Sequence, residues 1–451
     1  MTPGLLVLLH VMLCVAVAGY LLQQVILRGR AIDARLALPC LLAMLCYLYV
    51  SDYALHGAGA YITRWSRPEL WRLEAAHMRL LAILAAMTLA LSFLHSVLKQ
   101  DASGFKPQTQ TSIFAIVEDR TAAKQLTWCA LIILLCYALF VFRFHGYSIA
   151  AVADGIFAAR SERLSDVRFL SGGVRNPLFS IAESALPGCV AILGGGYALG
   201  LFRWPVRGLL LASFIVGAVF LFASGSRTVF VLSFLPLGLV FAKRLPPSLR
   251  LPLLVGGCIA LFAASSVMYQ FRSGGLAQLR EAQDISIGYH QDNNFALTVH
   301  ALDRAATTTE RVPSLKFWQT ALLNWVPRAV WPGKPLLTAQ DYQGYKETWW
   351  TQGFVGEFVA LYGPLPGAAL STLYICALYL LLLWALRKSS WQRRPMTSLL
   401  SVPIVLIYVY MCLRSCLNIS QFMYVLLPFA VVGLLSATSK ALKRRAMSVR
   451  L

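Results

Sequence analysis

Long apolar runs separated by short polar segments dominate the pattern of this chain. A transmembrane helix needs roughly 20 mostly apolar residues, and about eleven runs approach or exceed that length. We therefore predict an all-α polytopic membrane protein with about 11 (10–12) spans, whose ninth run is long and bent. The runs cover about residues 4–26, 36–54, 76–97, 126–143, 178–199, 206–223, 229–242, 251–270, 352–386, 397–413 and 419–439.

Basic segments between the runs indicate the orientation of the chain. Short loops rich in Lys and Arg stay on the cytoplasmic side of a membrane. Four such segments fall on one side if the N-terminus faces out, so we predict that topology for one membrane domain, 1–451. The segments are 28–35, 243–250, 387–394 and 440–450.

Two polar segments lie on the opposite, outer side in this topology. The middle one covers about 144–176, and the larger one covers about 271–351. A connection as long as the second is usually functional. Its apolar cluster at 317–326 predicts short helices at the membrane surface.

Composition narrows the function. The chain is 58% hydrophobic and 13% charged, with a formal net charge of +21. We attribute this charge to loops that meet anionic lipids rather than to nucleic-acid binding, because no RNA- or DNA-binding motif accompanies it. All ten cysteines fall in apolar runs, so neither a disulfide framework nor a cysteine metal site is expected. The chain also has no Walker, HExxH or GxSxG pattern, and we expect no metal or cofactor.

Several runs carry a cation at their outer end. These cations need an explanation, because the positive-inside rule disfavours basic residues on the outer side of a membrane. Each one alone is explained by a basic side chain reaching the lipid headgroups. A set of them at one depth fits an anion better, and the planar guanidinium matches phosphate. The set consists of Arg143, Arg175, Arg227, Arg272, Arg328, Lys334 and Arg414.

The segment 324–336, "NWVPRAVWPGKPL", carries two of these cations in a stiff frame. Its three prolines restrict the backbone, and Trp325 and Trp331 are suited to the membrane interface. The frame would hold Arg328 and Lys334 at the depth of lipid phosphates, although a plain interfacial anchor has the same composition.

Carboxylates and histidines are fewer. Glu357 lies in "TQGFVGEFVALYGPLPG" (351–367), where an acid in an apolar run must be paired or used, or else compensates the helix dipole. His290 and Asp292 lie in the polar stretch 288–304 and are alternative general bases, or simply solvated loop residues.

Glycines and prolines around Glu357 predict an irregular helix. Gly353 and Gly356 permit close packing. The stretch from Gly363 to Gly367, "GPLPG", should bend or break the run. A helix broken at membrane depth usually lines a cavity.

The combination of "PRAVWPGKP", "GFVGEFVALYG" and an earlier "SGSR" at a run boundary resembles the bacterial O-antigen polymerase (Wzy) family. The motifs cover about residues 220–370, and the hydropathy pattern covers the whole chain. The resemblance implies an architecture like that of the GT-C glycosyltransferases. It also implies a location in the bacterial inner membrane, with the active site facing the periplasm.

The resemblance further implies a metal-independent glycosyltransferase. Its donor would be a growing glycan on undecaprenyl diphosphate, and its acceptor a repeat unit on a second undecaprenyl diphosphate. Arg227 and Arg272 would contact diphosphate, and Arg328 and Lys334 a second phosphate or the leaving group. Glu357, Asp292 and His290 compete for the base. Expected partners are these lipid-linked oligosaccharides, the bilayer, a chain-length regulator and a flippase.

Three alternatives stay open at this point. An O-antigen ligase would have the same general shape. A flippase for the same lipid-linked units would also need cations, but along a path through both leaflets, and most runs lack interior charge. A non-catalytic assembly protein would need none of the outer cations.

Overall fold

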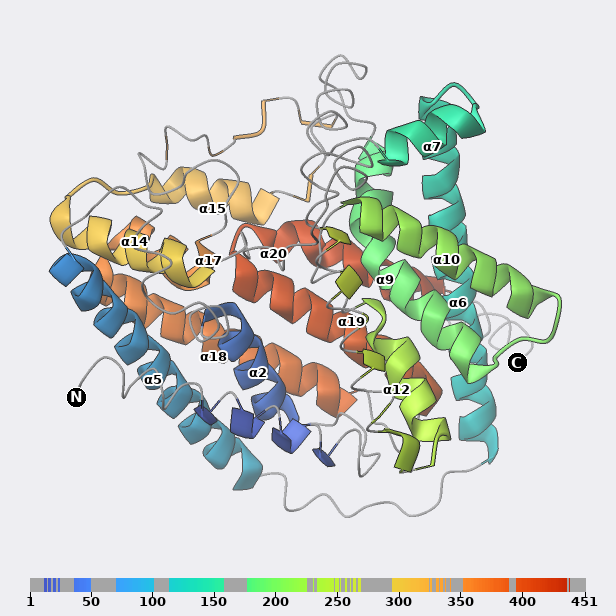
Figure 1. The fold of residues 1–451 in the computed structure, drawn as a ribbon, viewed down its shortest axis with the longest axis horizontal. Coiled ribbons are helices and arrows are strands. Elements are labelled where there is room, and N and C mark those ends of the chain that lie inside the picture. The colour runs from blue at the N-terminus through green and yellow to red at the C-terminus, as the bar shows by residue number, and fades with distance from the viewer. Residues whose placement is uncertain are drawn as a thin grey trace, which may run out of the picture.

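The computed structural model describes residues 36–49, 70–100, 113–157, 177–224, 233–246, 294–323, 352–388 and 395–435, and scattered positions in 12–24, 230, 248–268, 325–341 and 438. These residues form a bundle of helices and contain no strand (Figure 1). The helices are α2 (Ala37–Tyr49), α5 (Leu70–Gln100), α6 (Ile113–Phe144), α7 (Ile149–Phe157), α9 (Pro177–Leu199), α10 (Val206–Ser224), α12 (Leu235–Arg244), α14 (Asn294–Thr307), α15 (Ser314–Leu323), α17 (Gly353–Tyr362), α18 (Pro364–Lys388), α19 (Pro395–Arg414), α20 (Asn418–Gln421) and the 3₁₀ helix η4 (Phe422–Leu426).

Six helices in the described part of the chain are long and apolar enough to cross a membrane. Shorter apolar helices cover Ala37–Tyr49, Gly353–Tyr362 and Met423–Leu435. The predicted class, an all-α membrane protein, is confirmed. The predicted runs 4–26 and 251–270 lie mostly outside the described residues, so the count of eleven stays a prediction. The six candidate spans are Ala75–Leu98, Asp119–Phe144, Ile181–Leu199, Val206–Ala223, Pro364–Arg387 and Met396–Arg414.

Two of these spans form the interior of the bundle. The span windows of α9 and α19 are each 78% buried, whereas those of α5, α6, α10 and α18 are 33–39% buried. The outer helices expose large apolar side chains, such as Phe93 of α5 and Leu139 of α6. In a membrane such faces contact lipid, so these helices are apolar on every side. Amphipathicity therefore does not distinguish the face that packs inside the bundle from the face that contacts lipid.

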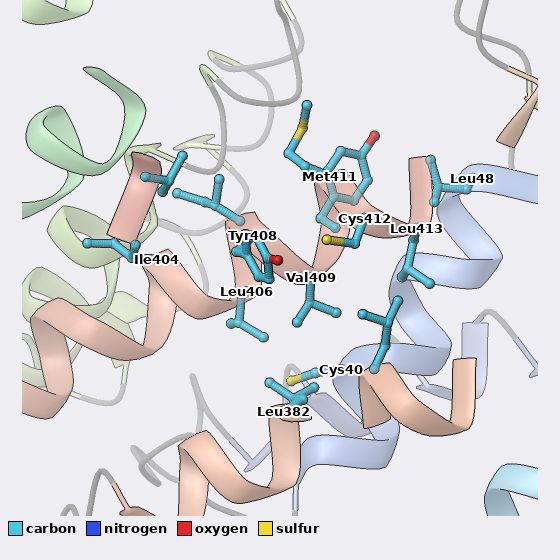
Figure 2. Close-up of a cluster of buried hydrophobic side chains, with 14 of the residues drawn as sticks. Cys40, Leu48, Leu382, Ile404, Leu406, Tyr408, Val409, Met411, Cys412 and Leu413 are labelled. Carbon is cyan, nitrogen blue, oxygen red and sulfur yellow. The ribbon is translucent and has the colours of Figure 1, made fainter. Parts of the chain in front are cut away.

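Helix α19 connects the two halves of the bundle. It contacts α6, α9 and α12 on one side and α2, α17 and α18 on the other. Figure 2 shows side chains of α2, α18 and α19 meeting in one apolar cluster, with Cys40, Leu382 and Val409 among them. These side chains are less than a tenth exposed. Cys412 is also buried here with a free thiol, so its role is packing.

Short helices gather at one end of the bundle, around the start of α17 and the end of α19 (Figure 1). Helix α14 packs on α17 and α5, and α15 packs on α20. Helix α15 confirms the short helix predicted around 317–326, and α7 lies within the middle polar segment. We call this end the Glu357 end. The opposite end, where α19 begins beside Asp119, is the Asp119 end.

Candidate functional site

The helix that carries Glu357 is broken, as its sequence predicts. Helix α17 is buried from Gly353 to Leu361 and has 10 residues, or about 15 Å, too short to span a bilayer. It ends at Gly363, whose φ of 88° favours glycine. Helix α18 begins at the next residue, Pro364, because proline fits a first turn that needs no N–H donor.

The two halves of the break pack tightly against each other. A Cβ at Gly367 would lie 2.6 Å from Val359 Cα, so no other residue fits this crossing. The Gly363 N–H donates to the Val359 carbonyl at 2.8 Å, and the Gly367 N–H donates to the Gly363 carbonyl at 2.9 Å. The break is therefore a fixed element of the fold in which the backbone N–H groups of both glycines have partners.

Glu357 lies in the second turn of α17 and reaches the turn that follows α19. Its side chain is 1% exposed. Ser415 Oγ donates to Glu357 Oε1 at 2.5 Å, and the Cys416 N–H donates to Oε2 at 2.7 Å. Hydrogen bonds of this kind favour the ionised carboxylate and offset part of the cost of burying it. The carboxylate is thus held by another helix end and not by the N-terminus of its own helix.

Aromatic and thiol groups enclose this carboxylate. Tyr374 packs against Phe354 and Phe358, with ring centroids 5.5 Å apart in both pairs. Tyr374 Oη donates to the Cys412 carbonyl at 3.0 Å. Burial, together with the nearby Glu357 carboxylate, raises the pKa of the Cys416 thiol well above its ordinary value. Cys416 therefore stays a thiol.

The start of α17 is packed closely against α2 and α14. Gly353 has a φ of 71°, and a Cβ there would lie 2.2 Å from Tyr49 Oη. A Cβ at Gly356 would lie 3.2 Å from Thr298 Oγ1. Thr298 Oγ1 in turn lies 2.5 Å from the Gln352 carbonyl. The close packing predicted for the two glycines is confirmed.

Gln352 is the residue at this helix start that sequence reasoning missed. Its side chain is 0% exposed, and neither its amide nitrogen nor its amide oxygen has a hydrogen-bond partner in the described part of the chain. An unsatisfied buried amide is costly, about 1–3 kcal/mol. A polar group beside Gln352 could use both its donor and its acceptor. The available signal was a residue with a polar amide directly before an apolar helix.

Arg311 is a second residue that sequence reasoning missed. Arg311 Nη1 donates to the Thr308 and Glu310 carbonyls at 2.7 and 2.8 Å, and Nη2 donates to the Ala305 carbonyl at 3.1 Å. These contacts cap the end of α14, where cations are favourable. A Cβ at Gly363 would lie 3.4 Å from Nη2, so the guanidinium lies against the break between α17 and α18.

The structure describes three of the predicted cations. Lys334 is 7% exposed, and its Nζ donates to the Val326 carbonyl at 3.1 Å, which ties the turn between them together. Arg414 is half-buried at the end of α19, one residue before Ser415, which contacts Glu357. Arg143 is exposed in the last turn of α6. Sequence neighbourhood thus places Arg414 beside the Glu357 contacts.

Trp325 and Trp331 are 45% and 39% exposed, which fits the anchoring role predicted for them. The remaining predicted site residues lie outside the described residues. They are His290, Asp292, Arg175, Arg227, Arg272 and Arg328. Among the described side chains, no group of three or more His, Cys, Asp or Glu could hold a metal ion.

The chain matches no protein-family model, no curated protein and no solved structure. The class of the protein is therefore described from its fold and its site alone. The protein is an all-α membrane protein in which a broken helix holds a buried, hydrogen-bonded carboxylate and follows a residue whose buried amide is unsatisfied within the described part of the chain.

Proposed function

We propose that the protein is a glycosyltransferase that polymerises oligosaccharide units linked to undecaprenyl diphosphate. The site would lie at the Glu357 end, facing the periplasm of a bacterial inner membrane. The observation that carries the proposal is that the short buried helix α17 holds the buried Glu357 carboxylate and follows Gln352, whose buried amide has no partner in the described part of the chain. A carboxylate can accept a proton from a sugar hydroxyl, and an amide can bind hydroxyls as donor and as acceptor.

The proposed reaction would use these groups as follows. The acceptor hydroxyl oxygen forms a bond to the anomeric carbon of the donor glycan. The bond from that carbon to the diphosphate oxygen breaks, and its electron pair leaves with undecaprenyl diphosphate. Glu357 takes the hydroxyl proton in this scheme, with Asp292 and His290 as the alternative bases. The chain grows by one block per cycle.

Cations stabilise the departing diphosphate in this scheme, as they do in phosphate-releasing enzymes generally. Arg414 is the nearest in sequence to the groups that hold Glu357. Lys334, Arg328, Arg227 and Arg272 are proposed for the two diphosphate positions, and Arg143 and Arg175 for the approach of anionic substrate.

The experiment is reconstitution of the purified full-length protein in proteoliposomes with undecaprenyl-diphosphate-linked repeat units and no other protein. We expect a ladder of longer glycans on the lipid and release of undecaprenyl diphosphate, seen by gel and mass spectrometry. Addition of lipid A core tests the ligase alternative, and a leaflet-protection assay tests the flippase alternative. Glycan transfer only to lipid A core, or movement of intact units between leaflets without elongation, would overturn the polymerase assignment.

A further inference from the structure

A basic hollow lies at the Asp119 end of the bundle, away from the proposed catalytic site. It has a volume of about 470 Å³ and is lined by Arg120, Thr121, Lys124, Leu201, Phe202 and Arg203. The residues come from the start of the membrane span in α6, which begins at Asp119, and from the link between α9 and α10. Helix α19, 20 residues or about 30 Å long, separates this end from Glu357.

The lining of this hollow includes three cations, Arg120, Lys124 and Arg203. Asp119 precedes Arg120, but its oxygens accept hydrogen bonds from the Met396 and Thr397 N–H groups at 2.8 and 3.0 Å. Within the described residues, Arg120, Lys124 and Arg203 take part in no ion pair. Like charges around one hollow repel each other, and an anion between them relieves that repulsion.

Further cations reinforce the positive potential. Arg207 of α10 lies over the Tyr197 ring, with 5.0 Å from Cζ to the centroid. Arg244, at the end of α12, comes within 3.9 Å of a Cβ built at Gly200. Stacking of the Arg207 guanidinium on the Tyr197 ring helps to hold this charge in place near the hollow.

The surroundings of the hollow mark the edge of the membrane. Its lining joins the start of the span Asp119–Phe144 to the link between the spans ending at Leu199 and beginning at Val206. Trp128 and Trp204 are 41% and 76% exposed, and exposed tryptophans favour the headgroup level of a bilayer. Trp128 packs edge-on against Phe202, and Lys124 Nζ lies 5.7 Å from the centroid of the same ring.

Size and chemistry together define the ligand class. The volume lies at the lower end of small-ligand pockets, which suits a phosphate with a small head group better than a glycan. Basic pockets between transmembrane helices bind anionic lipid head groups in this way. We propose that the hollow formed by Arg120, Lys124 and Arg203 binds the phosphate of an anionic phospholipid, whose acyl chains lie along the apolar faces of α6 and α10. This site is separate from the proposed active site and does not depend on it.

The experiment measures lipid binding to the full-length protein in detergent, by native mass spectrometry and by the rise in thermal midpoint. The probes are phosphatidylglycerol, zwitterionic phosphatidylcholine and inorganic phosphate. We compare the wild type with the single variants Arg120→Gln, Lys124→Gln and Arg203→Gln and with the triple variant. Arg387→Gln is the matched control, because it removes one exposed charge at the end of α18, where Arg387 donates to the Leu98 carbonyl instead of lining the hollow.

We expect the wild type to retain phosphatidylglycerol in preference to phosphatidylcholine. Each cation near a membrane surface contributes about 1 kcal/mol, so each single variant should bind about fivefold more weakly and the triple variant on the order of 100-fold. The control should bind like the wild type. Equal loss in the control and the triple variant would overturn the site, as would equal binding of both lipids. Binding of inorganic phosphate without phosphatidylglycerol would overturn the lipid assignment. If the triple variant does not fold, the three single variants decide.

Discussion

The two ends of α19 each meet a buried carboxylate from another helix, and the two carboxylates accept hydrogen bonds from different groups. At its start, Asp119 of α6 accepts from two backbone N–H groups of the first turn and from Thr397 Oγ1 at 2.5 Å. At its end, Glu357 of α17 accepts from one side-chain hydroxyl and one backbone N–H. Both side chains are 1% exposed.

Their surroundings explain the difference. Asp119 caps the start of α19, because it accepts hydrogen bonds from first-turn N–H groups that have no partner within the helix. Glu357 accepts from the Ser415 hydroxyl and from the Cys416 N–H, and the residue before its helix, Gln352, has a buried amide that no described residue satisfies. A buried acid on a short helix that follows an unsatisfied buried amide has the features of a site kept for a ligand. Burial alone therefore does not identify a catalytic carboxylate.

The largest effect is expected from Glu357→Gln, which removes the charge and keeps the shape. If Glu357 is the base, polymerisation by the purified protein should fall about 100- to 10,000-fold. The thermal midpoint should change little, because the Gln amide can still accept from the Cys416 N–H and face the Ser415 hydroxyl. Ladder formation in proteoliposomes measures the first, and thermal unfolding in detergent measures the second.

Asp119→Asn is the matched control, since it makes the same change at the other end of α19. Its turnover should stay within about twofold of the wild type, as for a change far from the chemistry. Near-normal turnover of Glu357→Gln would eliminate Glu357 as the base and leave Asp292 and His290. Equal loss in both variants would mean that the two carboxylates do not differ in role.

The next largest effect is expected on stability, from Gly353, which lets α2 approach the start of α17. Gly353→Ala places a Cβ 2.2 Å from Tyr49 Oη at a φ of 71°, so it should destabilise the protein by about 1–3 kcal/mol. Gly238→Ala in α12 is the control, because a Cβ there meets nothing within 4 Å. It should be neutral or stabilising by up to about 1 kcal/mol. Urea or thermal unfolding measures both, and equal behaviour would refute the close packing at α17.

Asp119→Ala tests the capping role at the other end. The substitution removes the carboxylate that accepts from the Met396 and Thr397 N–H groups. We expect the free energy of unfolding to fall by about 1–2 kcal/mol. Turnover measured well below the unfolding midpoint should persist. A variant that unfolds like the wild type would show that Asp119 does not cap α19, and a variant that is stable but inactive would place it in the chemistry.

Sequence reasoning recovered those parts of this molecule that depend on local chemistry. Apolar length predicted the membrane class, the glycine-proline stretch after Glu357 predicted the break at Gly363, and the cluster at 317–326 predicted α15. It could not predict which helix end would meet Glu357, because Ser415 and Cys416 are 58 and 59 residues away along the chain. Amphipathicity gave no guide either, since spans that face lipid are apolar on every side.

The residues that were missed show the same limit. Gln352 has no motif of its own, and only its burial without a partner reveals it. Arg311 stood outside the apolar runs, and its contact with the break depends on how α14 packs against α17. Asp119 was passed over because it lies at the edge of a span, where charged residues are common.

The smallest effect is expected on the apparent KM, when two lysines at the Glu357 end are compared. Lys316 is 37% exposed and pairs with Asp341 at 2.8 Å, whereas Lys334 is buried, as a cation held for substrate would be. Surface ion pairs contribute little, so Lys316→Met should leave the apparent KM for the lipid-linked substrate within about twofold. If Lys334 contacts diphosphate, Lys334→Met should raise that KM about fivefold, the equivalent of about 1 kcal/mol. An unchanged KM with a lowered thermal midpoint would mean that Lys334 only ties its turn to Val326, and that the phosphate contacts belong to Arg414 and the other arginines.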